Sequence, residues 1–441
     1  MSWIQRYKLR QFLRNSIWIL PVLGMVAAMV SVRFLHWVEV RAGWQVGLDP
    51  AATLTVFGAL AGSMLTFIVF LSSTLLLVMQ LASAQLSPRI IGVVFRDTVT
   101  RFTLTLFTFT FTFTLAVLLR IHTTVPAITA HVAAYLCLFS LGAFLLLIDH
   151  VGKTLRPSGA LQAVACAGHE VIQSVYPRRL SGPQVTAQGP VNALAGEPAG
   201  TVLSLMDGVV LAFDLEGLVA LAREADCVVE MVPQVGDFVA AGSPLFRIFG
   251  GQGGPAASTL CQSLALGQER TMEQDPALAF RIIVDIASKG LSPAINDPTT
   301  AVLAIDQIHH LLRSVGGRHL DEGLAYDRSG SLRLVYRTPD WEDFVYLAAT
   351  EIRQFGGTSI QVARRLRAML ENLIDVLPSE RTTLLRGELT LLHRSVERSF
   401  PEPEDQALAG VSDLQGVGGK NSGGKALASD LESTIAGPKA T

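Results

Sequence analysis

The chain has few charged residues, and they are unevenly distributed. Only 16% of its 441 residues are Asp, Glu, Lys or Arg, whereas soluble proteins carry about 25%. The deficit is concentrated in the first 150 residues, where four stretches have no formal charge: Asn15–Val32, Ala51–Pro88, Phe102–Leu119 and Ile121–Ile148. A helix of roughly 20 apolar residues crosses a bilayer. We therefore predict a transmembrane domain over 1–155, with spans at about 16–36, 53–80, 102–121 and 127–149.

The sequence also lacks a basic excess, paired cysteines and a recognisable catalytic pattern. The net charge of −2 gives no basic excess, which argues against a nucleic-acid partner. None of the four cysteines forms a C-x-x-C pair, so neither a disulfide framework nor a zinc site is expected. We predict no cofactor, no metal and no catalytic residues, because no nucleophile and base stand at a recognisable spacing. An enzyme is therefore the least favoured class.

The basic residues that flank the spans alternate between rich and poor segments. Basic residues are frequent before the first span, in the second loop and after the fourth span, and sparse in the first and third loops. Lysine and arginine are enriched in cytoplasmic loops. The pattern predicts a multi-pass protein of the bacterial inner membrane, with the N-terminus and the whole C-terminal part in the cytoplasm.

The third span has an unusual pattern, because phenylalanine or leucine alternates with threonine over Phe102–Leu115. A lone strand in lipid would leave its backbone groups unpaired, so a helix is expected. On a helix the threonines form two stripes: Thr103, Thr110 and Thr114, and nearly opposite them Thr105, Thr108 and Thr112. These stripes suit a helix between two neighbours, or beside a wet cavity that Thr105, Thr108 and Thr112 would line as a pore. Alternatively, the hydroxyls bond back to carbonyls of their own helix.

The C-terminal part is predicted to be an α+β domain in the cytoplasm. We expect a helix and linker over 156–200, a small β-barrel-like subdomain over 201–250, a helical domain over 260–400 and a disordered tail over 401–441. Val235–Ile248 resembles the repeat of biotinyl- and lipoyl-type barrel-sandwich domains. Those carriers attach their cofactor to a lysine, and no lysine lies between Lys153 and Lys289. The resemblance therefore concerns the fold, and a packing or assembly role is expected.

Polar residues gather around two predicted helix starts, Asp275-Pro276 and Asp297-Pro298. The candidate ligand-binding residues are Arg270, Glu273, Asp275, Arg281, Asp285, Asn296 and Asp297. They would hold a cation or a small ligand at two adjacent helix N-termini. The alternative is structural, because an N-cap alone stabilises a helix by about 1 kcal/mol. Arg364, Arg365 and Arg367, further along, are expected on a solvated helix face.

Several motifs resemble one family. They include Asp285-Ile-Ala, the run LSPAINDPTTA over Leu291–Ala301, Gln85–Arg89, Gly236–Val239 and Ile352–Gly356. The chain is similar in these motifs to the predicted bacterial membrane proteins catalogued as domain of unknown function 2254. That resemblance implies four N-terminal spans and a cytoplasmic domain, and it assigns no catalytic residue. Phe355 stands where a tyrosine is expected.

Two functions are compatible with these patterns. The first is an oligomeric channel or transporter for an ion or small solute, with a cytoplasmic domain that regulates or assembles it. The alternative is a membrane-tethered sensor or scaffold that binds a ligand or protein partner through the cytoplasmic domain. The expected partners are the lipid bilayer, further copies of the chain and a small ligand or ion whose identity the sequence leaves open.

Overall fold

A computed structural model of the chain describes residues 2–42, 45–46, 49–90, 98–121, 125–154, 156–180, 194, 196–251, 254–320 and 322–419. The chain forms two compact units. We call Lys8–Ala160 the membrane unit and Leu161–Thr441 the C-terminal unit; Met1–Tyr7 group with the latter. Each unit is described separately.

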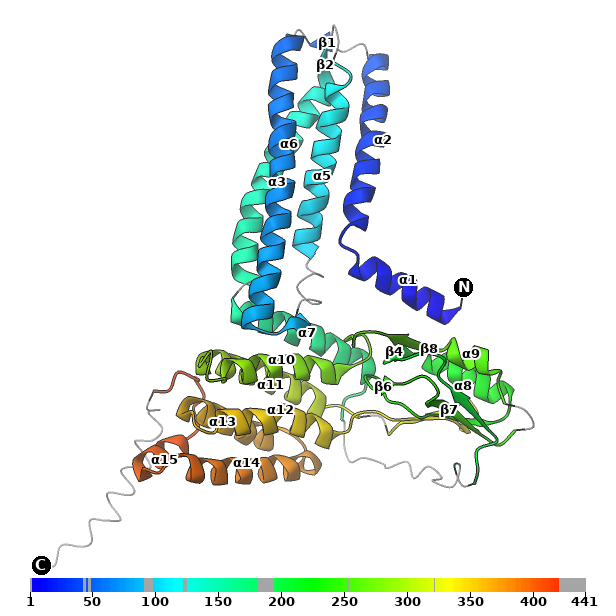
Figure 1. Cartoon of the computed structure of the whole chain (residues 1–441), viewed down its shortest axis with the longest axis vertical. Helices are drawn as coiled ribbons and strands as arrows, with labels where there is room; N and C mark the ends of the chain where they lie inside the picture. The colour runs from blue at the N-terminus through cyan, green and yellow to red at the C-terminus, as the bar shows by residue number, and fades with distance from the viewer. Residues whose placement is uncertain are drawn as a thin grey trace, which may run out of the picture. The chain divides into compact units, whose positions relative to one another are not determined.

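The membrane unit is built from long helices (Figure 1). Helix α1 covers Trp3–Asn15 and is followed by α2 (Ile19–Ala42), α3 (Pro50–Gln85), α5 (Thr98–Leu118) and α6 (Ala127–Thr154). Four of them are long and apolar enough to span a membrane, over Ile19–Arg41, Pro50–Ala84, Thr98–Leu118 and Ile128–Lys153. The four predicted spans are therefore present as helices, and α3 extends beyond the predicted 53–80 at both ends.

Helix α5 lies at the centre of the membrane unit and packs against α2, α3 and α6. Its Phe107 and Phe113 are fully buried, and the ring of Phe107 lies 5.8 Å from that of Phe67 on α3. At one end, β1 (Gln45–Val46) pairs antiparallel with β2 (Val125–Pro126), a contact that the sequence did not predict. A short 3-10 helix, η1 (Pro88–Ile90), follows α3.

The first part of the C-terminal unit contains two sheets. The sequence supplies β3 (Gly200–Leu203), β4 (Gly208–Phe213), β5 (Val228–Met231), β6 (Phe238–Val239), β7 (Pro244–Phe249), β8 (Leu264–Gly267), β9 (Leu324–Tyr326) and β10 (Leu332–Tyr336). Five strands form one sheet in the order β3-β7-β5-β10-β9, and three form another in the order β6-β4-β8. Helix α8 (Leu215–Glu224) packs its apolar face against their shared core, and the short α9 (Ala257–Cys261) precedes β8.

The small β-barrel-like subdomain predicted over 201–250 is not confirmed, because the described strands form two open sheets. Strand β10 lies beside β5 and pairs with it in parallel, with Leu334 opposite Val229. Val229 and Met231 are fully buried, so β5 needs a paired neighbour on each edge to satisfy its backbone. One neighbour is β7, and the other comes from about a hundred residues further along the chain.

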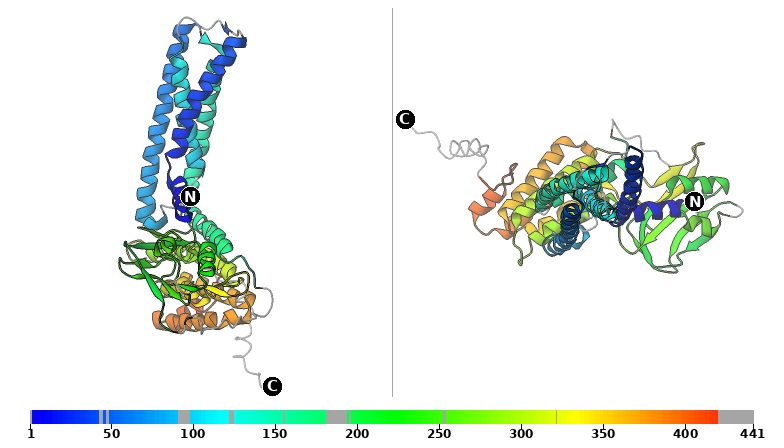
Figure 2. Two further views of the ribbon diagram at one scale, coloured as in Figure 1. Left: turned by 90° about the vertical axis from the view of Figure 1, so that its right-hand side faces the viewer. Right: turned by 90° about the horizontal axis from the view of Figure 1, so that it is seen from above.

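The helical part stacks in layers, which Figures 1 and 2 show as roughly parallel rods. It contains α10 (Pro276–Gly290), α11 (Pro298–Gly316), α12 (Trp341–Gly356), α13 (Ile360–Val376), α14 (Ser379–Ser399) and α15 (Pro403–Ala409). Helices α10 and α11 form one layer, α12 and α13 the next, and α14 packs on both of the latter. Helix α7 (Pro157–Val175) joins this stack where Gly168 meets Ala279 of α10 and Leu311 of α11.

The prediction of a disordered tail from 401 onward is wrong for its first part. Helix α15 folds onto α13, and so does the segment that follows it. We call this segment, residues 410–419, the strap. The guanidinium of Arg364 on α13 is buried and donates to the carbonyls of Val411, Gly418 and Gly419 at 3.0–3.2 Å. These polar contacts hold a segment that has no apolar period, so hydrophobic patterning could not reveal it. Residues 420–441 lie outside the described part of the chain.

Candidate functional site

The polar residues predicted to form one site lie in separate places. Asp275 caps α10, and Asp297 caps α11 after the loop that follows α10. Helix α10 has 15 residues, so its two ends are about 22 Å apart at 1.5 Å per residue. The two helix N-termini are therefore not adjacent, and the expected joint site at both of them does not form.

At the start of α10, Asp275 is committed to structural contacts. Its carboxylate accepts a hydrogen bond from the backbone N–H of Leu278 at 3.1 Å and pairs with the guanidinium of Arg270. Glu273 lies in the loop just before it. The turn before β6 packs on this pair at Gly236, where an added Cβ would stand 2.4 Å from Cζ of Arg270. Gly236 also has φ +94°, a conformation that favours glycine.

Arg281 on α10 joins that helix to α12. Its guanidinium contacts the carboxylate of Asp285 at 2.6 Å and that of Glu351 at 2.5 Å. The hydrogen bonds from Arg281 hold the pKa of the Glu351 carboxyl below its ordinary value. Arg281 and Asp285 thus belong to an ion-pair bridge between two helices, and Glu351 is the member that sequence reasoning missed.

The α10–α11 loop is a tight turn. The carboxylate of Asp297 accepts from the backbone N–H of Thr300 at 3.1 Å and from its hydroxyl at 2.5 Å. The N–H of Asp297 donates to the carbonyl of Gly290 at 2.7 Å, while Asn296 adopts φ +50°. Asparagine tolerates this left-handed conformation better than most residues. The loop contacts therefore favour the structural interpretation of Asn296 and Asp297.

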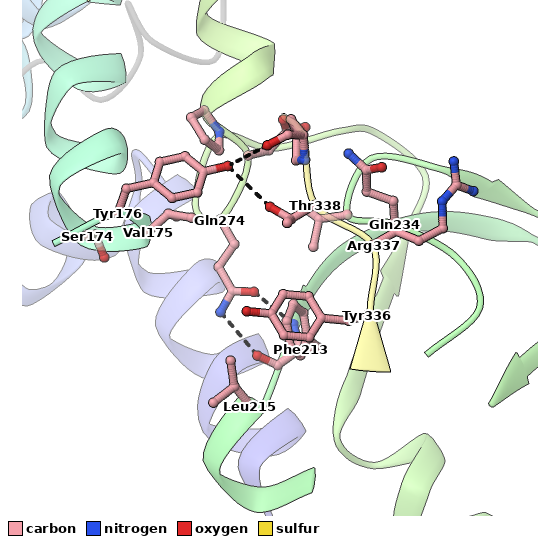
Figure 3. Close-up of a pocket in the computed structure, with 14 residues that line it drawn as sticks. Ser174, Val175, Tyr176, Phe213, Leu215, Gln234, Gln274, Tyr336, Arg337 and Thr338 are labelled. Atoms are coloured by element: carbon pink, nitrogen blue, oxygen red, sulfur yellow. Dashed lines mark hydrogen bonds between the residues drawn. The ribbon is translucent and has the colours of Figure 1, made fainter. Parts of the chain in front are cut away.

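A cavity of about 200 Å³ lies between the sheets and the helices of the C-terminal unit. Figure 3 shows its residues, which come from the end of α7, the β4–α8 junction, the turn after β5, the start of α10 and the end of β10. They are Ser174, Val175, Tyr176, Phe213, Leu215, Gln234, Val235, Gln274, Asp275, Pro276, Tyr336, Arg337, Thr338 and Pro339. Of the predicted site residues, Asp275 alone lines it.

Side chains of the cavity wall are held by hydrogen bonds to the protein. The amide of Gln274 donates to the carbonyl of Phe213 at 3.1 Å and accepts from the N–H of the same residue at 3.0 Å. The hydroxyl of Tyr176 lies 3.2 Å from that of Thr338. The rings of Phe213 and Tyr336 contact each other with their centroids 5.2 Å apart. These contacts fix the shape of the wall.

Arg337 is more exposed than Asp275, the other charged residue of the wall. It is 70% exposed, and its ion pair to the carboxylate of Asp237 is long, at 3.9 Å. Asp237 also accepts a hydrogen bond from the N–H of Gln234 at 2.9 Å, so this carboxylate already serves the turn. In Figure 3 the side chain of Arg337 lies on the opposite side of the view from Tyr176. Arg337 thus brings an exposed cation to the cavity.

The threonines proposed to line a pore bond to their own helix. The hydroxyls of Thr105, Thr108 and Thr112 donate to the carbonyls four residues earlier at 2.8–2.9 Å. This stripe faces α2, since an added Cβ on Gly24 would lie 3.0 Å from Cγ2 of Thr105. The opposite stripe faces α6, where the hydroxyls of Thr110 and Ser140 lie 3.0 Å apart. Both stripes therefore lie against neighbouring helices.

The described residues contain no group of three or more His, Cys, Asp or Glu side chains that could hold a metal ion. Four helices able to span a membrane, followed by an α/β region with two sheets, define the class of this chain as a multi-span membrane protein. The sequence profile of the family described as predicted membrane protein (DUF2254) matches residues 14–372, and the chain belongs to this family.

Relatives in two mycobacteria are similar over most of their length. Uncharacterized proteins of Mycobacterium bovis and Mycobacterium tuberculosis are each 24% identical to this chain over 430 residues. Each match covers 92% of this chain and 80% of the relative. The matched length includes both units. No solved structure matches the chain.

Proposed function

We propose that the protein is a membrane-tethered sensor that binds a small ligand in the cavity of its C-terminal unit. The observation that carries this proposal is the cavity of about 200 Å³, whose wall is assembled from distant segments and held by its own hydrogen bonds. Binding sites are typically preformed and apolar, with a few oriented polar groups. Phe213, Leu215, Val235 and Tyr336 supply the apolar part of such a site.

The position of the cavity along the chain supports a sensing role. Val175 and Tyr176, at the end of α7, belong to the wall. Helix α7 begins at Pro157, just after the last candidate spanning helix ends at Thr154. A ligand that changes the position of Tyr176 would thus act on the segment directly connected to that helix. Tyr176 is fully buried, so a shift of its ring requires its neighbours to move too.

The channel hypothesis receives no comparable support. Thr105, Thr108 and Thr112 use their hydroxyls within α5, and helix α2 packs against this stripe. Hydroxyls that line an aqueous path face the water, not a neighbouring helix. We therefore prefer the sensor to the channel or transporter.

We further propose that the C-terminal unit faces the cytoplasm of a bacterium and that the protein forms homo-oligomers in its inner membrane. The alternation of basic residues supports this orientation. Arg6→Cys and Ser329→Cys, each in a variant that lacks the four native cysteines, test it in intact cells, since both sites should resist a membrane-impermeant thiol reagent. The mass of the purified protein in nanodiscs tests the oligomer.

The ligand proposal is tested by filling the cavity. Leu215→Trp places an indole in the wall, whereas Leu205→Trp makes the same change at a residue that is 92% exposed and outside the wall. The thermal midpoint of the full chain in nanodiscs is measured against a library of small metabolites. A compound present at 100 times its Kd stabilises the folded state by about 2.7 kcal/mol.

We expect such compounds to stabilise the wild type and Leu205→Trp but not Leu215→Trp. Equal stabilisation of both variants would show that the ligand binds elsewhere. If every compound leaves all three midpoints unchanged, the sensor proposal loses its support.

A further inference from the structure

The size of the cavity limits what it can hold. An engineered apolar cavity of about 150 Å³ binds benzene. The cavity here, at about 200 Å³, has room for one such ring and a small substituent. A nucleotide or a lipid chain would exceed this volume. The part of a ligand that the cavity encloses is therefore small, with about ten non-hydrogen atoms.

The apolar part of the wall suits a flat body. Phe213 and Tyr336 present two rings tilted by 53° to each other, and Leu215 and Val235 add aliphatic surface. The amide of Gln274 is already engaged on both sides by the backbone of Phe213, so it does not demand a polar partner from the ligand. A flat apolar group can thus fill this part of the cavity without leaving a polar group of Gln274 unsatisfied.

The charged residues of the wall differ in their availability. The carboxylate of Asp275 is 2% exposed and bound to both Arg270 and the N–H of Leu278. The guanidinium of Arg337 is mostly exposed, and its contact with Asp237 exceeds the 2.7–2.9 Å of a charge-assisted hydrogen bond. A guanidinium matches the two oxygens of a carboxylate in a planar fork. The guanidinium of Arg337 would attract a ligand carboxylate and would repel a ligand cation.

We propose that the cavity binds a small organic anion, an aromatic carboxylate of about ten non-hydrogen atoms, with its ring packed against Phe213, Leu215 and Tyr336 and its carboxylate at Arg337. This inference rests on the proposed sensor function, because it assigns the chemical class of the ligand to the same cavity. The wall selects by size through its apolar residues and by charge through Arg337.

The experiment uses the full chain in phosphatidylcholine nanodiscs and two probes of equal size. Benzoate carries the charge, and benzamide is its neutral counterpart. Binding is measured by ligand-observed NMR, which detects the millimolar affinities expected of such small probes. The variants are Arg337→Gln, Arg337→Lys, Leu215→Trp and, as a control, Arg328→Gln, which changes an exposed arginine outside the wall.

We expect benzoate to bind the wild type up to about fivefold more tightly than benzamide, because an ion pair with an exposed guanidinium contributes about 1 kcal/mol or less. Arg337→Gln should remove this preference, Arg337→Lys should retain part of it, and Arg328→Gln should leave it unchanged. A higher salt concentration should weaken the binding of benzoate more than the binding of benzamide, because salt screens the charge of Arg337.

The two proposals fail in different ways. If benzamide binds as tightly as benzoate and Arg337→Gln changes neither, while Leu215→Trp abolishes both, the anion proposal is overturned and the cavity remains a ligand site. If benzoate binds Leu215→Trp as well as it binds the wild type, or if neither probe binds at all, the assignment of this cavity as a site for such ligands is overturned too.

Discussion

The membrane unit and the C-terminal unit satisfy their polar side chains over different sequence distances. In α5 the threonine hydroxyls donate to carbonyls four residues away in the same helix. In the C-terminal unit, Arg364 bonds to carbonyls about fifty residues further on, and Arg353 pairs with Glu388 at 3.1 Å across two helices. Local contacts predominate along α5, and these long-range contacts connect the C-terminal unit.

The surroundings of each unit explain this difference. A helix in lipid has no water to satisfy its hydroxyls, so a partner within the same helix is available before and after packing. In the C-terminal unit, water solvates the charges of the unfolded chain, and they lose that water only when distant elements meet. Side-chain truncation should therefore cost little in α5 and much where a buried charge joins two elements.

The largest effect is expected for Arg364→Leu. Arg364 is 1% exposed, and its loss leaves three strap carbonyls without their donor. It also removes the positive charge that interacts with the buried carboxylate of Asp413. We expect a loss of about 3 kcal/mol in the free energy of unfolding, measured by denaturant titration of the C-terminal unit within the full chain. The strap should also become a cleavage site in limited proteolysis. Arg386→Leu, on an exposed face of α14, is the control and should change stability little.

A second substitution compares helix packing in the two units. An added Cβ on Gly168 of α7 would stand 2.5 Å from Cβ of Ala279, whereas an added Cβ on Gly58 of α3 would meet nothing within 4 Å beyond its own stretch of helix. Gly168→Val should destabilise the C-terminal unit by about 2 kcal/mol through overpacking. Gly58→Val should leave the thermal midpoint of the monomer nearly unchanged. A similar loss at both positions would contradict the open surroundings of Gly58.

A third prediction concerns the α10–α11 loop. Asp297→Ala removes the cap of α11 and should cost about 1 kcal/mol. Asp297→Asn keeps an acceptor for the Thr300 N–H and should recover most of this loss. If the Asp297 carboxylate instead held a ligand, Asp297→Asn would still recover the thermal midpoint measured without ligand. It would then lack the further stabilisation that the ligand gives to the wild type.

The smallest effect is expected inside the membrane unit. Thr110→Val removes the contact to Ser140 between two helices, while Thr108→Val removes bonds within α5 alone. Hydrogen bonds between membrane helices average about 0.6 kcal/mol, so Thr110→Val should lower the unfolding free energy by about that amount and Thr108→Val by less. The measurement is the unfolding equilibrium in detergent. The reverse order would mean that α5 uses its hydroxyls differently from the contacts seen here.

Features that depend on neighbouring residues could be predicted from the sequence. The four spans follow from uncharged apolar runs, and the starts of α10 and α11 follow from Asp275-Pro276 and Asp297-Pro298. The sequence also indicated that a helix with two hydroxyl stripes lies between two neighbours, as α5 does between α2 and α6.

Features that depend on distant partners could not be predicted. Arg364 was expected on a solvated helix face because no nearby residue indicates that the strap covers it. The β-barrel-like subdomain is not confirmed because β5 takes its second neighbour from β10, which no local pattern links to it. The cavity was missed for the same reason, since its wall joins α7, β4, α10 and β10.

The parallel pairing of β5 with β10 has a consequence for the synthesis of the protein. A ribosome adds about 5–20 residues per second, and roughly 100 residues separate Val229 from Leu334, its partner. For at least several seconds, β5 is translated but its outer edge has no strand to pair with. An unpaired edge of this kind is prone to pair with another chain. Nascent chains of this protein should therefore depend on a chaperone until β10 is complete.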